Sequence, residues 1–199
     1  MIEVLISNKS NYLLFLICYF IGSIPFGYIF YKIIKKDDIR NHGSGNIGAT
    51  NVNRLIGKKF GVITLILDFL KTFCPCLIIH KYFGTEVGVV SGFLTILGHM
   101  FPIWLKFKGG KGVATYVGML IILNYFLGIV FGIVWVITYL ISKYSSLGSI
   151  LGSLSVPIFI FFYSSDNIMF YFIMFILIFY THRENVKRLI NKEETKTKI

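Results

Sequence analysis

The sequence predicts an all-α integral membrane protein: a bundle of seven transmembrane helices with the amino terminus outside the cell and the carboxyl terminus in the cytoplasm. Three observations lead to this prediction. Of the 199 residues, 55% are hydrophobic and only 15% are charged, which is more apolar than a soluble domain of this size needs. The apolar residues gather in long runs. The basic residues, which bring the net charge to +11, gather in alternate loops between those runs.

Seven apolar runs define the expected helices. They cover residues 12–31, 60–80, 87–105, 113–124, 125–142, 147–164 and 168–181. Crossing the hydrocarbon core takes about 20 helical residues. The first run lacks a basic lead segment and a small-residue cleavage site, and Lys32 follows it directly, so we expect a retained anchor rather than a cleaved signal. Pro25 and Pro102 are expected to kink spans and to free backbone carbonyls.

The uncharged stretch 113–142 could cross the membrane once or twice, and the positions of the basic residues decide between these possibilities. Two crossings place four basic groups inside: seven residues in 32–59, three in 106–111, Lys143, and six in the tail. One crossing would move Lys143 and the tail outside, against the preference of Lys and Arg for the cytoplasmic side. Two crossings leave only Lys9 and Lys81 outside. The charge pattern therefore predicts seven spans.

Under this topology four polar runs lie on the cytoplasmic face of a single domain, 1–199, whose basic cytoplasmic tail is 182–199. These runs are "HGSGNIGATNVNR" (42–54), "KFKGGKG" (106–112), "KYSS" (143–146) and "HREN" (182–185). Segments that are far apart in the sequence are thus expected to converge at one membrane surface. This convergence is the main structural prediction.

The first polar run has the composition of an anion site. Its glycines are Gly43, Gly45 and Gly48, and glycine permits the positive φ with which successive backbone N–H groups form a concave nest. Ser44, Thr50 and Asn51 add neutral donors, and Arg54 adds a planar fork suited to phosphate. No carboxylate interrupts the run. The alternative is a flexible polar connector.

The second polar run repeats this chemistry. Lys106, Lys108 and Lys111 surround Gly109 and Gly110, and Gly112 leads into an apolar helix. A helix amino terminus with glycines and lysines favours an anion. The run is not a Walker A loop, because glycine rather than Ser or Thr follows Gly110-Lys111. The alternative is an ordinary positively charged inside loop.

Other polar residues carry weaker predictions. His182 and Asn185 are three apart and share a helical face, although a histidine at a membrane edge can also be a simple polar tip. Asp68 and Lys71 lie inside an apolar run, where an internal ion pair is the simplest expectation. The chain has neither HExxH nor a histidine–carboxylate metal cluster, so no metal and no cofactor are expected.

Seven stretches in order along the chain resemble a known family. They are "IGSIPFGYI", "DIRNHGSGNIGATNVNR", "LDFLKT", "LGHMFP", "FKGGKGVAT", "SKYSSLGSI" and "HRENVKRL". Together they resemble the bacterial membrane glycerol-3-phosphate acyltransferases that use acyl phosphate as donor. The resemblance implies that a long-chain acyl phosphate gives its acyl group to the primary hydroxyl of glycerol 3-phosphate. The products would be lysophosphatidate (1-acyl-glycerol 3-phosphate) and phosphate, in the first acylation of phospholipid synthesis.

The resemblance also implies roles for individual residues. Five match catalytic positions that hold glycerol phosphate: Ser44, Arg54, Lys111, His182 and Asn185. Twelve match substrate-binding positions: Gly43, Gly45, Asn46, Gly48, Thr50, Asn51, Lys108, Gly109, Gly110, Gly112, Ser146 and Glu194. Thr50 and the amides from Gly45 to Asn51 would hold the donor phosphate. In the tail "RLINKEE", Lys192 replaces a family glycine and Glu194 takes the place of the family's acid.

The expected mechanism needs mainly orientation and charge stabilisation, because phosphate is a good leaving group. The donor's own phosphate is expected to accept the proton, with His182 positioning the acceptor. The expected partners are the two substrates and the lipid bilayer, without nucleic acid or an obligatory protein partner. The expected location is the bacterial cell membrane, with the site facing the cytoplasm. An organophosphate transporter and a lipid-binding scaffold remain as alternatives.

Overall fold

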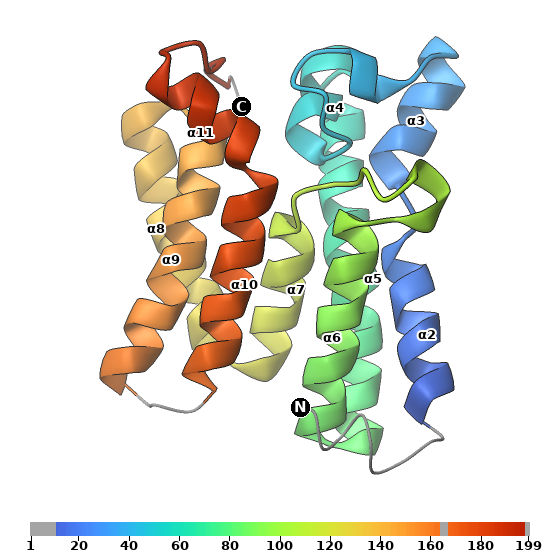
Figure 1. Ribbon diagram of the computed structural model, residues 1–199, viewed down its shortest axis with the longest axis vertical. Coiled ribbons are helices and arrows are strands. Elements are labelled where there is room, and N and C mark those ends of the chain that lie inside the picture. Colours follow the sequence, from blue (N-terminus) through green and yellow to red (C-terminus); the bar gives the residue numbers. More distant parts are fainter. Residues whose placement is uncertain (1–10, 164–166, 198–199) are drawn as a thin grey trace. The chain divides into compact units, whose positions relative to one another are not determined.

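A computed structural model describes residues 11–163 and 167–197, and the described residues form helices joined by short loops, without strands. Figure 1 shows these elements. The α-helices are α2 (Asn11–Gly22), α3 (Phe26–Lys35), α4 (Ala49–Ile56), α5 (Lys58–Phe83), α6 (Thr85–Met100), α7 (Val113–Leu123), α8 (Tyr125–Ser142), α9 (Ser145–Tyr163), α10 (Ile168–Thr181) and α11 (Arg183–Ile190). Two 3-10 turns are η1 (Ile39–Asn41) and η2 (Ile103–Leu105). The all-α prediction is confirmed.

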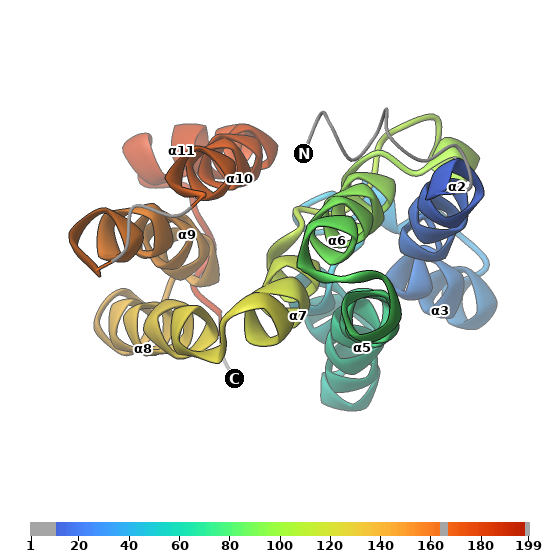
Figure 2. The same cartoon turned by 90° about the horizontal axis from the view of Figure 1, so that it is seen from below.

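The chain forms two compact units, Met1–Leu123 and Asn124–Ile199. In unit 1, α5 packs against α4, α6 and α7, and α2 packs against α6. In unit 2, α9 packs against both α8 and α10, as Figure 2 shows from below. The expectation of a single domain over 1–199 stays a prediction.

Five helical segments are long and apolar enough to cross a membrane. They are Asn11–Lys35, Lys58–Phe83, Thr85–Leu105, Tyr125–Ser142 and Ser145–Tyr163. Val113–Leu123 and Ile168–Thr181 are shorter apolar helices. Each of the seven predicted runs thus contains an apolar helix, while the number of crossings and the orientation of the termini stay predictions. Lys9, which the charge argument places outside, lies outside the described residues.

The proline predictions are confirmed, and they correct two helix boundaries. The run predicted as 12–31 is interrupted at residues 23–25, where α2 ends and Pro25 precedes α3. The run predicted as 87–105 stops being α-helical at Met100, because Pro102 disfavours helical backbone in the residue before it. In 113–142 the chain forms two helices, as predicted, with the side chain of Asn124 capping the second by accepting from the Phe126 N–H at 3.1 Å.

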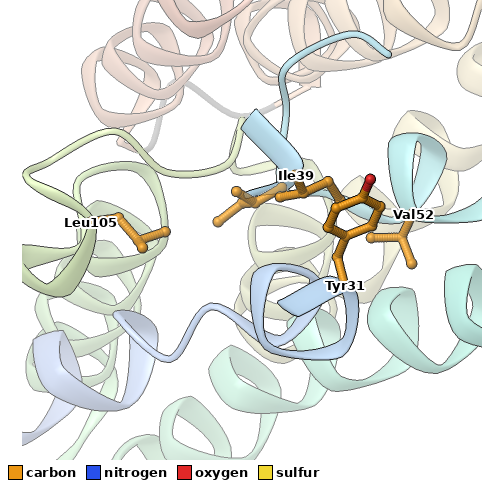
Figure 3. Packing of buried hydrophobic residues seen from close by; sticks show 5 residues of the cluster. Tyr31, Ile39, Val52 and Leu105 are labelled. Carbon is orange, nitrogen blue, oxygen red and sulfur yellow. The ribbon is translucent and has the colours of Figure 1, made fainter. Parts of the chain in front are cut away.

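A small apolar cluster organises the upper end of unit 1. Figure 3 shows Tyr31, Ile39, Val52 and Leu105, which together with Ile47 are buried against one another. These side chains come from α3, η1, α4, η2 and the loop before α4. The cluster therefore ties the first polar run and the entry to the second polar run to the same end of the unit.

Candidate active site

The first polar loop, residues 42–48, is organised by one amide side chain. Asn51, on α4, is almost fully buried, and its Oδ1 accepts from the Ser44 N–H at 2.9 Å. Its Nδ2 donates to the carbonyls of His42 at 3.1 Å and Asn46 at 2.9 Å. Gly43 has φ of 59°, and a Cβ there would clash with Asn51 Oδ1. The loop therefore closes around Asn51, and glycine is required at position 43 by both conformation and space.

This geometry refines the prediction for the loop. Both hydrogens of Asn51 Nδ2 are used inside the protein, so Asn51 positions the loop instead of donating to a ligand through its side chain. The Gly45 N–H donates to His42 O at 3.0 Å, and the Asn51 N–H donates to Gly48 O at 3.1 Å. The predicted anion-binding amides are therefore limited to those of residues 46–49, which lead into the amino end of α4.

The charges around this loop favour an anion. Arg54 is exposed on α4, and no acid pairs with it among the described residues. The two preceding acids are occupied: Asp38 pairs with Arg40 at 2.6 Å, and Asp37 pairs with His42 at 2.7 Å. The hydrogen bond from Arg40 is the main reason that the pKa of Asp38 lies below its usual value.

The second polar loop folds back on the end of α6. The Gly109 N–H donates to Met100 O at 3.1 Å, and the Gly110 N–H donates to His99 O at 2.9 Å. Gly112 has φ of 82°, and its carbonyl accepts from the Thr115 hydroxyl at 2.8 Å at the start of α7. The amides of Gly109 and Gly110 are thus occupied within the protein. Lys108 and Lys111 are therefore the groups of this loop that the predicted anion binding depends on.

Unit 1 brings the two loops to one end, as Figure 1 shows. Arg40 Nη1 donates to the carbonyl of Leu105 at 3.0 Å, so η1 is joined to η2 by a hydrogen bond as well as by the apolar cluster. Sequence reasoning assigned no role to Arg40. Its neighbour Asp38, two positions earlier, was the available indication that its guanidinium would be held in place.

Unit 2 contributes a network centred on a carboxylate. Glu194 Oε1 accepts from Ser146 Oγ at 2.9 Å and from Asn185 Nδ2 at 2.7 Å, and its Oε2 accepts from Arg188 Nε at 2.8 Å. Burial raises the pKa of Glu194, but these three hydrogen bonds outweigh it, so the pKa lies below the usual value. The structure thus brings together three predicted residues, and it adds Arg188 to them.

His182 lies at the junction of α10 and α11, three residues before Asn185. It is buried, and its Nδ1 lies 2.8 Å from the carbonyl oxygen of Ile178. A carbonyl can only accept, so Nδ1 carries a hydrogen and Nε2 is the nitrogen that lacks one in the neutral ring. The ring is therefore held in the tautomer that accepts a hydrogen bond at Nε2.

The predicted residues fall into two groups. Ser44, Arg54 and Lys111 lie in unit 1, and His182 and Asn185 lie in unit 2. Among residues 11–163 and 167–197, no group of three or more His, Cys, Asp or Glu side chains could hold a metal ion.

Comparison with known proteins identifies the family. Residues 12–192 match the family model described as glycerol-3-phosphate acyltransferase. The chain belongs to this family. The acyltransferase is 57% identical over 197 residues to the glycerol-3-phosphate acyltransferase of Pelagibacter ubique, covering 99% of each chain. It is 45% identical to the Brucella canis glycerol-3-phosphate acyltransferase, covering 89% of each chain.

Two crystal structures of PlsY (YgiH), an integral membrane glycerol 3-phosphate acyltransferase, resemble the acyltransferase described here. The glycerol 3-phosphate form is 40% identical, with a TM-score of 0.89 over 96% of both chains. The lysophosphatidic acid form is also 40% identical, with a TM-score of 0.84 over 94% of this chain and 95% of the other. The expected family is thus confirmed, and membership favours an enzyme over the transporter and scaffold alternatives.

Proposed function

We propose that this acyltransferase moves a fatty acyl group from acyl phosphate to the primary hydroxyl of glycerol 3-phosphate. The hydroxyl oxygen attacks the acyl carbonyl carbon, and the bond between that carbon and the phosphate oxygen breaks. Inorganic phosphate leaves, and 1-acyl-glycerol 3-phosphate (lysophosphatidate) is the product. The hydroxyl proton passes to the departing phosphate.

The observation that carries this proposal is the pair of polar loops at one end of unit 1 (Figure 1). Two loops lie there, one closed around Asn51 with Arg54 beside it and the other carrying Lys108 and Lys111. The nearby acids already have partners: Asp38 pairs with Arg40, and Asp37 is hydrogen-bonded to His42. Two acid-poor loops with guanidinium and ammonium groups suit two phosphorylated substrates. A phosphate on each substrate is what acyl phosphate and glycerol 3-phosphate share.

The family resemblance adds residues of unit 2 to this proposal. Ser44, Arg54 and Lys111 bind glycerol 3-phosphate together with His182 and Asn185, and Ser146 and Glu194 hold Asn185 in place. The hydrogen bond from Asn185 to Glu194 is the observation that favours this positioning role for Glu194. The similar crystal structure of PlsY in its glycerol 3-phosphate form supports the choice of acceptor.

The proposed setting is a bacterial cell membrane crossed seven times, with the site on the cytoplasmic side. Seven apolar helical segments in the described part of the chain support this topology, five of them long and two short. So does the charge distribution, which places 17 of the 20 Lys and Arg residues in the loops assigned to the inside. The substrates and the bilayer are the proposed partners.

Catalysis in this proposal requires no protein base. Arg54 and Lys111 neutralise the phosphates. Nε2 of His182 accepts a hydrogen bond from the secondary hydroxyl of glycerol 3-phosphate, which orients the acceptor and leaves the proton of the primary hydroxyl for the departing phosphate. His182→Gln keeps a hydrogen-bonding group but cannot titrate. We expect kcat to fall about tenfold with the pH profile unchanged. Near-complete loss with intact glycerol 3-phosphate binding would instead assign His182 as the base.

One assay tests the reaction. Purified protein is mixed with palmitoyl phosphate, with and without glycerol 3-phosphate, and both released phosphate and lysophosphatidate are measured. Acceptor-dependent release of the two products in equal amounts is expected. Product formed from acyl-CoA or acyl carrier protein but not from acyl phosphate would overturn the proposed donor. Passage of glycerol 3-phosphate across vesicles without product would overturn the enzymatic proposal.

A further inference from the structure

Three ionisable side chains are buried together inside unit 1, away from both polar loops in the sequence. Asp68 and Lys71 lie on α5 and His99 lies near the end of α6. Their side chains are 6%, 2% and 4% exposed. Lys71 Nζ lies 2.8 Å from Asp68 Oδ1, which confirms the expected ion pair. The ion pair alone, however, does not explain why His99 is buried beside these two side chains.

Lys71 connects three parts of unit 1. Its Nζ donates to the carbonyl of Ile24 at 2.9 Å, in the break between α2 and α3. The same Nζ lies 2.8 Å from His99 Nδ1. The Ile24 carbonyl, which lies where the helix is broken between α2 and α3, is therefore satisfied by an ammonium group that also contacts α6. The ammonium uses its hydrogens on Ile24 and His99 while Asp68 neutralises its charge.

The contact with Lys71 fixes the protonation of His99. An ammonium group has no acceptor, so His99 Nδ1 must accept the hydrogen bond and the neutral ring carries its hydrogen on Nε2. Nε2 is the ring atom that a Cβ at Gly110 would strike first, followed by the two ring carbons beside it. The ring held by Lys71 thus forms the seat against which Gly110 packs.

The second glycine loop is joined to this seat by backbone as well. The Gly110 N–H donates to the carbonyl of His99 itself at 2.9 Å. Gly110 does not have a positive φ, unlike Gly112. The lack of a side chain at position 110 is therefore required by the His99 ring and not by backbone conformation. Lys111 is the next residue along the chain.

We propose that Asp68, Lys71 and His99 form a positioning network that sets the second glycine loop, and through it Lys111, for acyl transfer. The proposal rests on the role of Lys111 in the proposed function. The physical reason is that burying charged groups within an apolar helix costs free energy. Ionisable side chains inside such helices therefore usually have a structural or functional role. Here the network joins a broken helix to the seat of an anion-binding loop.

A suppressor experiment tests the seat directly. In Gly110→Ala the three atoms nearest to the new methyl all belong to the His99 ring, at the far end of a side chain. His99→Asn removes the ring but keeps an oxygen that can replace Nδ1 as the acceptor from Lys71. We expect Gly110→Ala to lower kcat/KM about 50-fold or more, and the double variant to regain about tenfold. A double variant no more active than Gly110→Ala would overturn the proposal.

Gly109 provides the matched control. A Cβ at Gly109 would strike the carbonyl oxygens of His99 and Met100 and the ring of Pro102. None of these atoms moves when the His99 side chain is shortened. Gly109→Ala is therefore expected to lose activity in both backgrounds, without recovery from His99→Asn. Equal recovery at both glycines would show general loosening of the loop and would overturn the specific seat.

A second measurement reads the loop without any substrate. Lys106, Lys108 and Lys111 make the loop a trypsin target if it leaves its seat. We expect Lys71→Met and His99→Leu to speed cleavage at these lysines roughly tenfold. His99→Asn loses the ring but keeps an acceptor for Lys71, so it should be cleaved more slowly than His99→Leu. Each variant is first shown to be folded and monodisperse, and Gly110→Ala serves as a positive control.

Thr72→Val is the control on the same helix. Thr72 is fully buried beside Lys71, and its hydroxyl has no hydrogen-bond partner among the described residues. Removing that hydroxyl should leave cleavage and kcat/KM within twofold of the wild type. If folded Lys71→Met and His99→Leu are also cleaved like the wild type, the network does not position the loop. This result is independent of the donor, so it separates failure of the network from failure of the proposed reaction.

Discussion

The two units hold their polar groups by opposite means. In unit 1 a neutral amide, Asn51, makes three hydrogen bonds to the backbone of the first glycine loop. In unit 2 a carboxylate, Glu194, accepts from the side chains of Ser146, Asn185 and Arg188. In each unit a single side chain makes several hydrogen bonds and so fixes the groups around it. The difference lies in charge and in what is held, backbone in one case and side chains in the other.

This difference fits the proposal that the first glycine loop binds phosphate. A carboxylate at position 51 would place a negative charge inside a loop proposed to bind phosphate. An amide offers both donors and an acceptor without that charge. At position 194 the carboxylate is tolerated because Arg188 neutralises it and three donors satisfy it. Order in the anion-binding loop is thus obtained without an acid, and order in the tail is obtained with one.

Asn51→Asp would break the comparison most severely. The substitution replaces the Nδ2 donor by an oxygen that faces the carbonyls of His42 and Asn46, and it buries an unpaired charge. We expect kcat/KM to fall by about 100-fold or more and the free energy of unfolding to fall by about 3–5 kcal/mol. Steady-state kinetics and thermal unfolding of purified protein measure the two effects.

Asn41→Asp is the matched control for this substitution. Asn41 is exposed in η1, so the same new charge appears near the loop without removing a buried hydrogen bond. A loss of a few-fold at most is expected. If Asn41→Asp were as harmful as Asn51→Asp, charge alone would explain the result, and the role of the buried amide would be wrong.

Glu194→Gln tests the other member of the pair. Gln can accept through one oxygen, but its amide nitrogen cannot accept from Arg188 or Asn185. We expect a roughly tenfold lower kcat/KM, through Asn185, and a loss of about 1–3 kcal/mol of stability. Glu193→Gln, at an exposed neighbour, should behave like the wild type. Equal effects at positions 193 and 194 would contradict the network.

The pH dependence sharpens the comparison further. The pKa of Glu194 in the folded protein lies below its usual value of about 4.5. A lowered pKa means that the carboxylate stabilises the fold fully above pH 4.5 and that this stabilisation is lost as the pH falls through the folded pKa. The difference in unfolding temperature between wild type and Glu194→Gln should therefore be constant from pH 7 to 5 and shrink below pH 4.5. Asn51 adds no titration in this range, and a constant difference down to pH 3.5 would contradict the assignment.

The sequence was sufficient for the fold class and for the polar segments, because hydrophobic runs, prolines and glycines act locally. It was also sufficient for the Asp68–Lys71 ion pair, since the two residues are one helical turn apart. It could not show that the amides of Gly109 and Gly110 are occupied by α6, because that contact depends on how the loop folds back. Nor could it show that Asn51 faces inward while Arg54, three residues later, is exposed. Roles of polar residues depended on such tertiary contacts.

The smallest effect is expected at Asp37, which pairs with His42 at 2.7 Å on the surface of the first loop. The two side chains are 53% and 40% exposed, and exposed ion pairs contribute little. The hydrogen bond from His42 lowers the pKa of Asp37, yet the loop is held by the His42 carbonyl and not by its ring. Asp37→Asn should therefore change kcat/KM by less than about twofold at pH 7. A tenfold loss in steady-state assays would mean that the His42 ring also positions the loop, and Asn51 would no longer suffice as its organiser.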